Sequence, residues 1–226
     1  MKNSRFREML DKLNKTFSRR IGRRLSNHRK ELLLNILPKY QFSYERFVLS
    51  TKKRKVLEIG FGMGEHLFYQ VALNPDILYV GVEVYLNGVA SLLKLGSQGN
   101  KDNLLIWAND LDMILKNIPN HSIDRVQILF PDPWHKRRYL KKRLVNRDRM
   151  NMFKSKLKLG GFIDFASDVK DYFEDVKKIS IEDNQLSVNN NFYIPHEGYI
   201  LTRYHQKAIK ENRLVQFLQA KLITSY

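Results

Sequence analysis

The fold is decided by the stretch Val56-Leu57-Glu58-Ile59-Gly60-Phe61-Gly62-Met63-Gly64-Glu65. Its apolar start predicts a buried strand, which passes directly into a turn with glycine at every second position. Because glycine has no Cβ, its backbone can approach a ligand closely, and the following helix points its positive end at that ligand. The spacing differs from the G-x-G-x-x-G of dinucleotide-binding turns. The turn therefore indicates a nucleoside cofactor that carries an amino acid.

Downstream of this turn, short apolar runs alternate with segments of helical spacing. The predicted strands are residues 56–59, 78–83, 104–108, 125–130 and 162–166. The predicted helices are residues 66–73, 86–95, 111–116, 149–158 and 170–179, with an earlier one over 28–37 that stops at Pro38. Strands that alternate with helices imply parallel βαβ units with right-handed crossovers.

The C-terminal part has a different pattern. Residues 192–194 and 199–204 are predicted to be two strands joined by the turn Pro195-His196-Glu197-Gly198, and residues 208–222 are predicted to form a last helix. The predicted architecture is therefore α/β and Rossmann-like. It has a mostly parallel seven-stranded sheet with helices on both faces and an antiparallel C-terminal hairpin.

The composition indicates a polyanionic partner. The 226 residues include 40 Lys and Arg against 23 Asp and Glu, a formal net charge of +17, and the basic residues cluster at 19–30 and 136–149. Such clustering favours nucleic acid over a merely solubilising surface. We expect residues 1–30 to form a mobile basic arm and residues 31–226 to form one domain. Without cysteine there are no disulfides, and neither a metal site nor a membrane span is expected, so a cytoplasmic location is the simplest prediction.

Acidic side chains fall at the ends of three predicted strands, where open α/β sheets bind their ligands. Glu58 precedes the glycines and can face a cationic amino-acid group. Glu83 lies about 20 residues beyond them, the usual place for a carboxylate that binds ribose hydroxyls. Asn109 and Asp110 end the third strand, where Asp110 can accept a hydrogen bond from an adenine amino group. The alternatives are that Glu83 is a surface residue and Asp110 a helix N-cap.

The fourth predicted strand delivers a second motif to the same edge, Phe130-Pro131-Asp132-Pro133-Trp134-His135-Lys136. The two prolines restrict the backbone around Asp132. A rigid loop that offers a carboxylate and an aromatic ring suits the recognition of a flat base. The alternative is a structural turn with a buried Trp134.

Three blocks of this sequence resemble the bacterial tRNA (guanine-N7)-methyltransferases, namely Leu57–Glu65, Pro131–Lys136 and Thr202–Tyr204. The resemblance extends from residue 18 to the predicted last helix. It implies a class I fold dependent on S-adenosylmethionine (SAM), S-adenosylhomocysteine as product, and methylation of a guanine in the tRNA variable loop, position 46 in the usual tRNA numbering. We expect a monomer, with a homodimer as the alternative.

The resemblance also implies roles for single residues. The cofactor would be bound by Glu58, Gly60, Gly62, Gly64, Glu83, Asn109, Asp110 and Asp132, and Asp132 would also be catalytic. The substrate would be contacted by Lys136, Asp168, Thr202, Arg203, Tyr204 and His205. The RNA-contacting segment would be Arg138, Tyr139, Leu140, Lys141, Lys142 and Arg143.

Two positions depart from the family pattern. His205 stands where the family usually has Glu, which puts the guanine contact at that position in doubt, and Tyr139 replaces a His. Three other interpretations stay open: a SAM-dependent enzyme for another RNA position or another acceptor, a non-catalytic RNA-binding module on the same scaffold, and a nicotinamide oxidoreductase. The glycine spacing disfavours the last of these.

Overall fold

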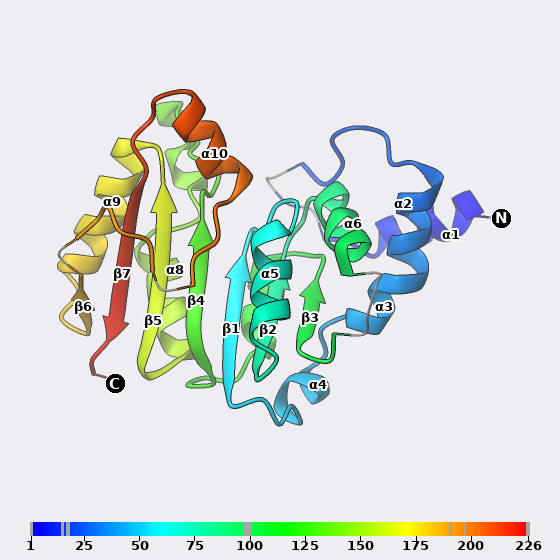
Figure 1. Ribbon diagram of the computed structural model, residues 1–226, viewed down its shortest axis with the longest axis horizontal. Coiled ribbons are helices and arrows are strands. Elements are labelled where there is room, and N and C mark those ends of the chain that lie inside the picture. The colour runs from blue at the N-terminus through cyan, green and yellow to red at the C-terminus, as the bar shows by residue number, and fades with distance from the viewer. Residues whose placement is uncertain are drawn as a thin grey trace. The chain divides into compact units, whose positions relative to one another are not determined.

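The computed structural model describes residues 2–14, 16, 19–96, 101–189, 191–196 and 198–224, which form two compact units, Met1–Asn117 and Ile118–Tyr226 (Figure 1). All five predicted strands of the βα region are present, three in the first unit and two in the second. None of the helices in these ranges is long and apolar enough to cross a membrane.

The first unit contains a parallel three-stranded sheet in the order β3-β2-β1. Its strands are β1 (Arg54–Ile59), β2 (Ile77–Val82) and β3 (Leu104–Trp107). Its helices after β1 are α5 (Glu65–Leu73), α6 (Leu86–Leu95) and α7 (Leu111–Asn117). Every residue of the central strand β2 is buried, as expected for a strand covered on both faces. Ile59 lies opposite Val82 and Val82 opposite Trp107, so the three strands end at one edge.

The N-terminal residues also contribute to the core of this unit. The helix α1 (Lys2–Asp11) buries Phe6, and Leu25 is buried in the same cluster as Val89 of α6. Ser26 caps the next helix by accepting a hydrogen bond from the Arg29 amide. The mobility of residues 1–30 and the domain boundary at residue 30 stay predictions.

The predicted helix end at Pro38 was wrong. The chain continues helically through α2 (Asn27–Glu31), the π-helical turn η1 (Leu32–Ile36) and α3 (Leu37–Tyr40), with α4 (Tyr44–Val48) after it. The Leu37 amide donates to the Leu32 carbonyl, five residues back. Because proline lacks an amide hydrogen and its ring crowds the preceding turn, a widened turn lets the helix pass Pro38.

The second unit contains a mixed four-stranded sheet in the order β4-β5-β7-β6. Its strands are β4 (Ile123–Leu129), β5 (Leu157–Ser167), β6 (Leu186–Val188) and β7 (Gln216–Leu222). Its helices are the 3-10 helix η3 (Arg137–Lys142) and the α-helices α8 (Arg147–Lys156), α9 (Lys170–Ile181) and α10 (Arg203–Lys210). The strand β5 pairs in parallel with β4 and antiparallel with β7.

The antiparallel C-terminal strands were predicted, but their positions were wrong. Residues 192–194 and 199–204 are not strands, and the predicted helix over 208–222 is replaced by the end of α10 and by β7. Glu197 of the predicted turn lies outside the described residues. Asn212, at φ 50°, follows α10 in a left-handed conformation that interrupts the helix. The strand β7 then pairs on both sides, with β5 and β6, and this pairing overrides its local helix propensity.

Candidate active site

The glycine turn after β1 has a backbone that other residues cannot adopt without strain. Gly60, Gly62 and Gly64 have φ values of 75°, 57° and 85°. A Cβ on Gly64 would lie 2.7 Å from the Leu92 Cβ, and one on Gly88 of α6 would lie 2.0 Å from the Gly62 carbonyl oxygen. The turn and α6 therefore approach each other at backbone distance, and the turn's conformation requires glycine.

Glu83, which directly follows β2, forms hydrogen bonds that link the end of that strand to this turn. One carboxylate oxygen accepts a hydrogen bond from the Gly62 amide at 2.8 Å, and the other accepts one from the Tyr85 amide at 2.8 Å. The residue is 8% exposed, so it is not the surface residue of the alternative interpretation. The structure thus brings Glu83 and the glycines together, while the ribose contact expected for Glu83 stays a prediction.

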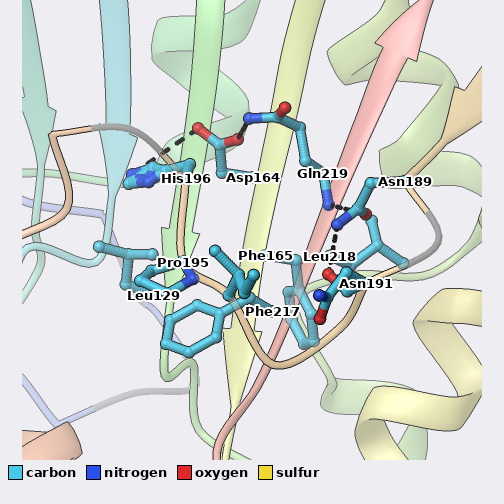
Figure 2. A pocket seen from close by; sticks show the side chains of 11 residues that line it. Leu129, Asp164, Phe165, Asn189, Asn191, Pro195, His196, Phe217, Leu218 and Gln219 are labelled. Carbon is cyan, nitrogen blue, oxygen red and sulfur yellow. Dashed lines mark hydrogen bonds and ion pairs between the residues drawn. The ribbon is translucent and has the colours of Figure 1, made fainter.

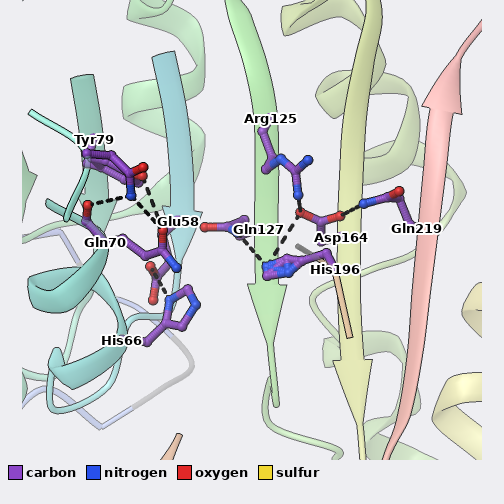
Figure 3. Close-up of polar contacts among 10 residues, drawn as sticks. Glu58, His66, Gln70, Tyr79, Arg125, Gln127, Asp164, His196 and Gln219 are labelled. Atoms are coloured by element: carbon purple, nitrogen blue, oxygen red, sulfur yellow. Dashed lines mark hydrogen bonds and ion pairs between the residues drawn. The ribbon is translucent and has the colours of Figure 1, made fainter. Parts of the chain in front are cut away.

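Glu58, in β1, is buried against a histidine that the sequence analysis missed. Its carboxylate lies 3.0 Å from Nδ1 of His66 on α5, and the two residues are 2% and 3% exposed (Figure 3). His66 lies eight positions after Glu58, just beyond the glycines, and that proximity was the available signal. The pair places a carboxylate beside an imidazole at the strand end next to the turn.

Asn109 and Asp110 follow β3, and their side chains accept hydrogen bonds from other parts of the first unit. Asp110 accepts a hydrogen bond from the Asp112 amide at 2.9 Å and so caps α7, as the alternative interpretation expected. The Asn109 side-chain oxygen accepts hydrogen bonds from the Asn14 amide at 3.0 Å and from Arg20 at 2.8 Å. Burial lowers the pKa of Arg20, and the negative charge of Asp110 opposes that shift. The basic N-terminal segment therefore reaches this strand end.

In the second unit, the loop after β4 is strained at both ends. Phe130 and Trp134 have φ values of 54° and 46°, a region that bulky residues rarely adopt. Such strain persists only where the surroundings impose it, and it concentrates at functional sites. Between these residues, Asp132 is exposed. Trp134 is only half-buried, unlike the buried residue of the purely structural interpretation, and meets the Tyr139 ring edge-on at 5.9 Å.

The predicted RNA-contacting segment divides into outward-facing and inward-facing residues. Lys136, Arg138, Leu140 and Lys141 are exposed. The Lys142 ammonium lies 5.0 Å from the Trp134 ring centre and 4.6 Å from that of Tyr139, and the Arg138 guanidinium lies 4.7 Å from Tyr139. Arg143 differs: its side chain is only 4% exposed and bonds to protein groups, so it does not present itself to a phosphate.

The remaining predicted substrate residues lie at the beginning of α10 and after β5. Thr202 caps α10 by accepting a hydrogen bond from the His205 amide at 3.1 Å, and Arg203 is exposed. The Tyr204 ring stacks on Phe130 with 6.4 Å between ring centres. Asp168 forms an ion pair with Arg213, which the sequence analysis did not single out.

His205, in the first turn of α10, lies among aromatic side chains. Its ring contacts Phe130 and Phe217, and its Nδ1 lies 3.0 Å from the Tyr199 hydroxyl. Burial lowers the pKa of His205. The start of α10 is therefore packed directly against the residue that opens the strained loop.

A buried polar row crosses the second unit's sheet and was also missed, because nothing in the sequence marks it. Gln127, Asp164 and Gln219 lie opposite one another on β4, β5 and β7. Asp164 accepts hydrogen bonds from Arg125 and Gln219, both at 2.8 Å (Figure 3). A cavity of about 250 Å³ beside this row is shown in Figure 2. Its lining includes Asp164, Gln219 and His196, which bond within the row.

The described residues contain no group of three or more histidine or acidic side chains placed to hold a metal ion.

Solved structures with the same architecture define the class of this chain. It aligns with the 16S rRNA methyltransferase KamB at a TM-score of 0.60 and 16% identity, covering 80% of this chain and 94% of that one. A 16S rRNA (adenine(1408)-N(1))-methyltransferase from Catenulisporales acidiphilia, solved with SAM as cosubstrate, aligns at 0.57 and 14% identity over 82% and 93%. The fold is that of the class I methyltransferases.

Sequence comparisons identify the family to which the chain belongs. Residues 52–218 match a family model described as a putative methyltransferase. A tRNA (guanine-N(7)-)-methyltransferase from Wolbachia pipientis wMel is 38% identical, with 84% of this chain and 86% of that protein covered. One from Brucella anthropi is 33% identical over 89% and 92%. The chain belongs to the tRNA (guanine-N7)-methyltransferase family, which confirms the resemblance found in the sequence.

Some relatives are much longer. A protein from Rickettsia typhi named a bifunctional methyltransferase is 51% identical over 91% of this chain. The chain spans about 40% of the length of that relative.

Proposed function

We propose that this chain transfers a methyl group from SAM to N7 of the variable-loop guanine, position 46, of tRNA. The observation that carries the proposal is the strained loop after β4, which holds an exposed Asp132 between two left-handed aromatic residues. Relatives named for guanine-N7 methylation of tRNA support the choice of atom and substrate. A cytoplasmic location and a monomeric state remain predictions that belong to this proposal.

The glycine turn fits SAM as the methyl donor. At Gly60 no atom lies within 4 Å of an added Cβ, so the backbone there faces open space in which a ligand can approach it closely. The Glu83 carboxylate accepts hydrogen bonds from the Gly62 and Tyr85 amides at the end of β2, and we assign the ribose hydroxyls to this carboxylate because of its place about 20 residues beyond the glycines. We assign the cationic amino-acid end of the cofactor to Glu58 and the adenine amino group to Asp110. When bound, SAM supplies an electrophilic methyl group.

The chemistry at N7 explains the residues chosen for the acceptor. N7 of guanine carries a lone pair and no proton, so attack on the methyl group requires no general base. Catalysis is then mainly the alignment of the attacking nitrogen with the methyl carbon. The methylated guanine is cationic, and the Asp132 carboxylate stabilises that developing charge. Carboxylates at Asp132 and Asp168 also suit the N1–H and amino donors of guanine.

In this proposal the exposed basic residues bind the phosphates of tRNA. Lys136, Arg138 and Lys141 project from the segment that follows the strained loop. Their contacts with phosphates would release counterions, so binding should weaken as salt rises. Phosphate contacts fix the orientation of the RNA without reading its sequence.

The test is methyl transfer from labelled SAM to two tRNA transcripts that differ only at the variable-loop guanine, with mass spectrometry of the nucleosides. We expect N7-methylguanosine from the transcript that has the guanine and none from a transcript with adenine there. Methylation of both transcripts would favour another RNA position. Failure to bind SAM in calorimetry would instead favour the non-catalytic RNA-binding module.

A further inference from the structure

One arginine of the basic segment has a buried side chain that does not face the solvent. Arg143 follows η3, and its side chain is 4% exposed although Leu140 and Lys141 of η3 are exposed. Its Nε donates to the Pro133 carbonyl at 2.9 Å, while its other two nitrogens donate to Asp175 at 2.6 Å and to Asp171 at 2.5 Å. All three nitrogens of the guanidinium therefore have protein acceptors.

The acceptors on α9 are arranged for this one cation. Asp171 and Asp175 are four residues apart on the same helix, a spacing at which two carboxylates repel each other unless a cation lies between them. Hydrogen bonding to Arg143 holds the pKa of the Asp171 carboxyl below its usual value. The guanidinium also lies 4.6 Å from the ring centre of Tyr172, a buried residue of α9 that follows Asp171 directly. A buried charge is tolerated because it is paired and hydrogen-bonded in this way.

The third acceptor connects this cation to the strained loop. The Pro133 carbonyl belongs to the peptide group between Pro133 and Trp134, directly after Asp132. Trp134 has a φ of 46°, a left-handed conformation that is strained for a residue with a bulky side chain. A hydrogen bond from a fixed guanidinium to the adjoining carbonyl orients that peptide group and opposes relaxation of the loop.

We propose that Arg143 is a positioning residue, which anchors the Pro133–Trp134 peptide to α9 and thereby fixes Asp132 for methyl transfer. The proposal rests on the proposed function of Asp132, and it replaces the phosphate contact expected for Arg143. Arg143 acts through the loop and touches neither substrate. Its neighbour Lys142 faces the rings of Trp134 and Tyr139, so adjacent residues support the loop from two directions.

The first experiment compares Arg143→Lys with Arg46→Lys. Arg46 is an exposed arginine of α4, outside both basic clusters, and its guanidinium also donates to a backbone carbonyl, that of Gln41 at 3.0 Å. Lysine keeps the charge but loses the planar fork, so Arg143→Lys should lower kcat by about 10- to 100-fold, as expected for a misplaced catalytic group. Its Kd for tRNA should change less than threefold, and Arg46→Lys should change neither quantity by more than twofold. A weaker tRNA complex with unchanged kcat would overturn the proposal and restore the phosphate contact.

The second experiment removes the acceptors instead of the arginine. Asp171→Asn with Asp175→Asn deletes two negative charges, so electrostatic attraction to tRNA cannot fall. If Arg143 serves as an anchor, kcat falls about tenfold or more while tRNA binding stays equal or tightens. If Arg143 serves the RNA, freeing it leaves kcat intact, and that result would refute the anchor. Thermal melts of each variant identify any loss that comes from unfolding.

A third readout does not depend on methyl transfer at all. Trp134 is one of two tryptophans, and Trp107→Phe leaves it as the sole fluorophore of that kind. In this background, Arg143→Lys should raise acrylamide quenching of Trp134 about twofold, and unchanged quenching would argue against loop release. If the parent protein methylates no tRNA, the proposed function fails, and the quenching result still decides whether Arg143 holds the loop.

Discussion

The glycine turn after β1 and the proline loop after β4 both present backbone at the end of a strand, but they reach their shapes differently. The turn uses three glycines, for which positive φ values carry no Cβ penalty, and Glu83 bonds its Gly62 amide. The loop forces Phe130 and Trp134 into the same region of φ, where their side chains are strained. Contacts with Arg143, which pairs with α9, and with Tyr204 of α10 hold the loop in that conformation.

The contrast follows from what each segment is proposed to hold. A cofactor cradle requires close backbone approach, which the absence of side chains supplies. A reaction centre requires one carboxylate held at a fixed place, which a rigid and braced loop supplies. If this division is right, a change at Asp132 should act mainly on turnover and a change at the glycine turn mainly on SAM affinity.

Asp132→Asn should have the largest effect on activity. Losing the negative charge beside a developing cation should lower kcat by about 10²- to 10³-fold. SAM affinity, measured by calorimetry, should fall much less than kcat, because Asp132 is one of several expected cofactor contacts and the glycine turn is untouched. The matched control is Asp148→Asn, an exposed carboxylate at the beginning of α8. Near-normal turnover by Asp132→Asn would remove Asp132 from the catalytic role.

Gly88→Ala should act on the other region. The new Cβ would lie 2.0 Å from the Gly62 carbonyl oxygen, so α6 and the turn must separate. We expect a loss of about 1–3 kcal/mol in the free energy of unfolding, typical of overpacking. SAM binding should weaken about tenfold, which corresponds to roughly 1.4 kcal/mol.

The control for this change is Gly96→Ala, because no atom lies within 4 Å of a Cβ added there. Denaturant unfolding and calorimetry measure the two effects separately. Equal SAM affinity in both alanine variants would show that the cofactor does not depend on the close approach of α6.

Arg138→Glu combined with Lys141→Glu should weaken tRNA binding by about tenfold at physiological salt. The slope of log K against log salt should become shallower by about 1 for each lost phosphate contact. Lys53→Glu with Arg54→Glu is the control, because these basic residues lie at the other end of β1 from the glycine turn. A salt slope that is identical in both double variants would exclude the segment after the loop from the RNA interface.

The sequence predicts features that arise from local patterns better than features that arise from contacts between distant segments. The glycines, Glu83 and the alternation of strands and helices are local patterns, and each was found near its predicted place. The strand β7 was not, because Gln216–Leu222 has no alternating pattern and becomes a strand by pairing with β5 and β6. A short stretch of sequence does not show whether another strand has an unpaired edge with which it can form hydrogen bonds.

The same reasoning explains the misjudged side chains. Arg143 belongs to a run of basic residues, and composition alone could not show that its acceptors lie on α9, about 30 residues away. The residues Gln127, Asp164 and Gln219 are ordinary polar residues until the register of three strands aligns them. Motifs identify residues by type and spacing, whereas burial and partners depend on tertiary contacts.

The smallest expected effect concerns His205, which stands where the family usually has Glu. Burial lowers its pKa, so the folded state binds a proton less readily than the unfolded chain. Stability from this residue is therefore fully present above the unfolded pKa of about 6.5 and is lost as the pH falls below it. Protonation would also place a cation among the rings of Phe130, Tyr199 and Phe217, against which α10 packs.

Thermal unfolding at pH 7.5 and pH 5.5 measures this effect as the difference between the wild type and His205→Gln. Glutamine keeps a polar group near the Tyr199 hydroxyl but does not titrate in this range. The wild type should lose slightly more Tm than the variant over that interval, and its tRNA methylation should decline with it because α10 contacts Phe130. Parallel pH profiles for the two proteins would mean that the Phe130 end of the loop is held independently of His205, leaving the Arg143 side as its main brace.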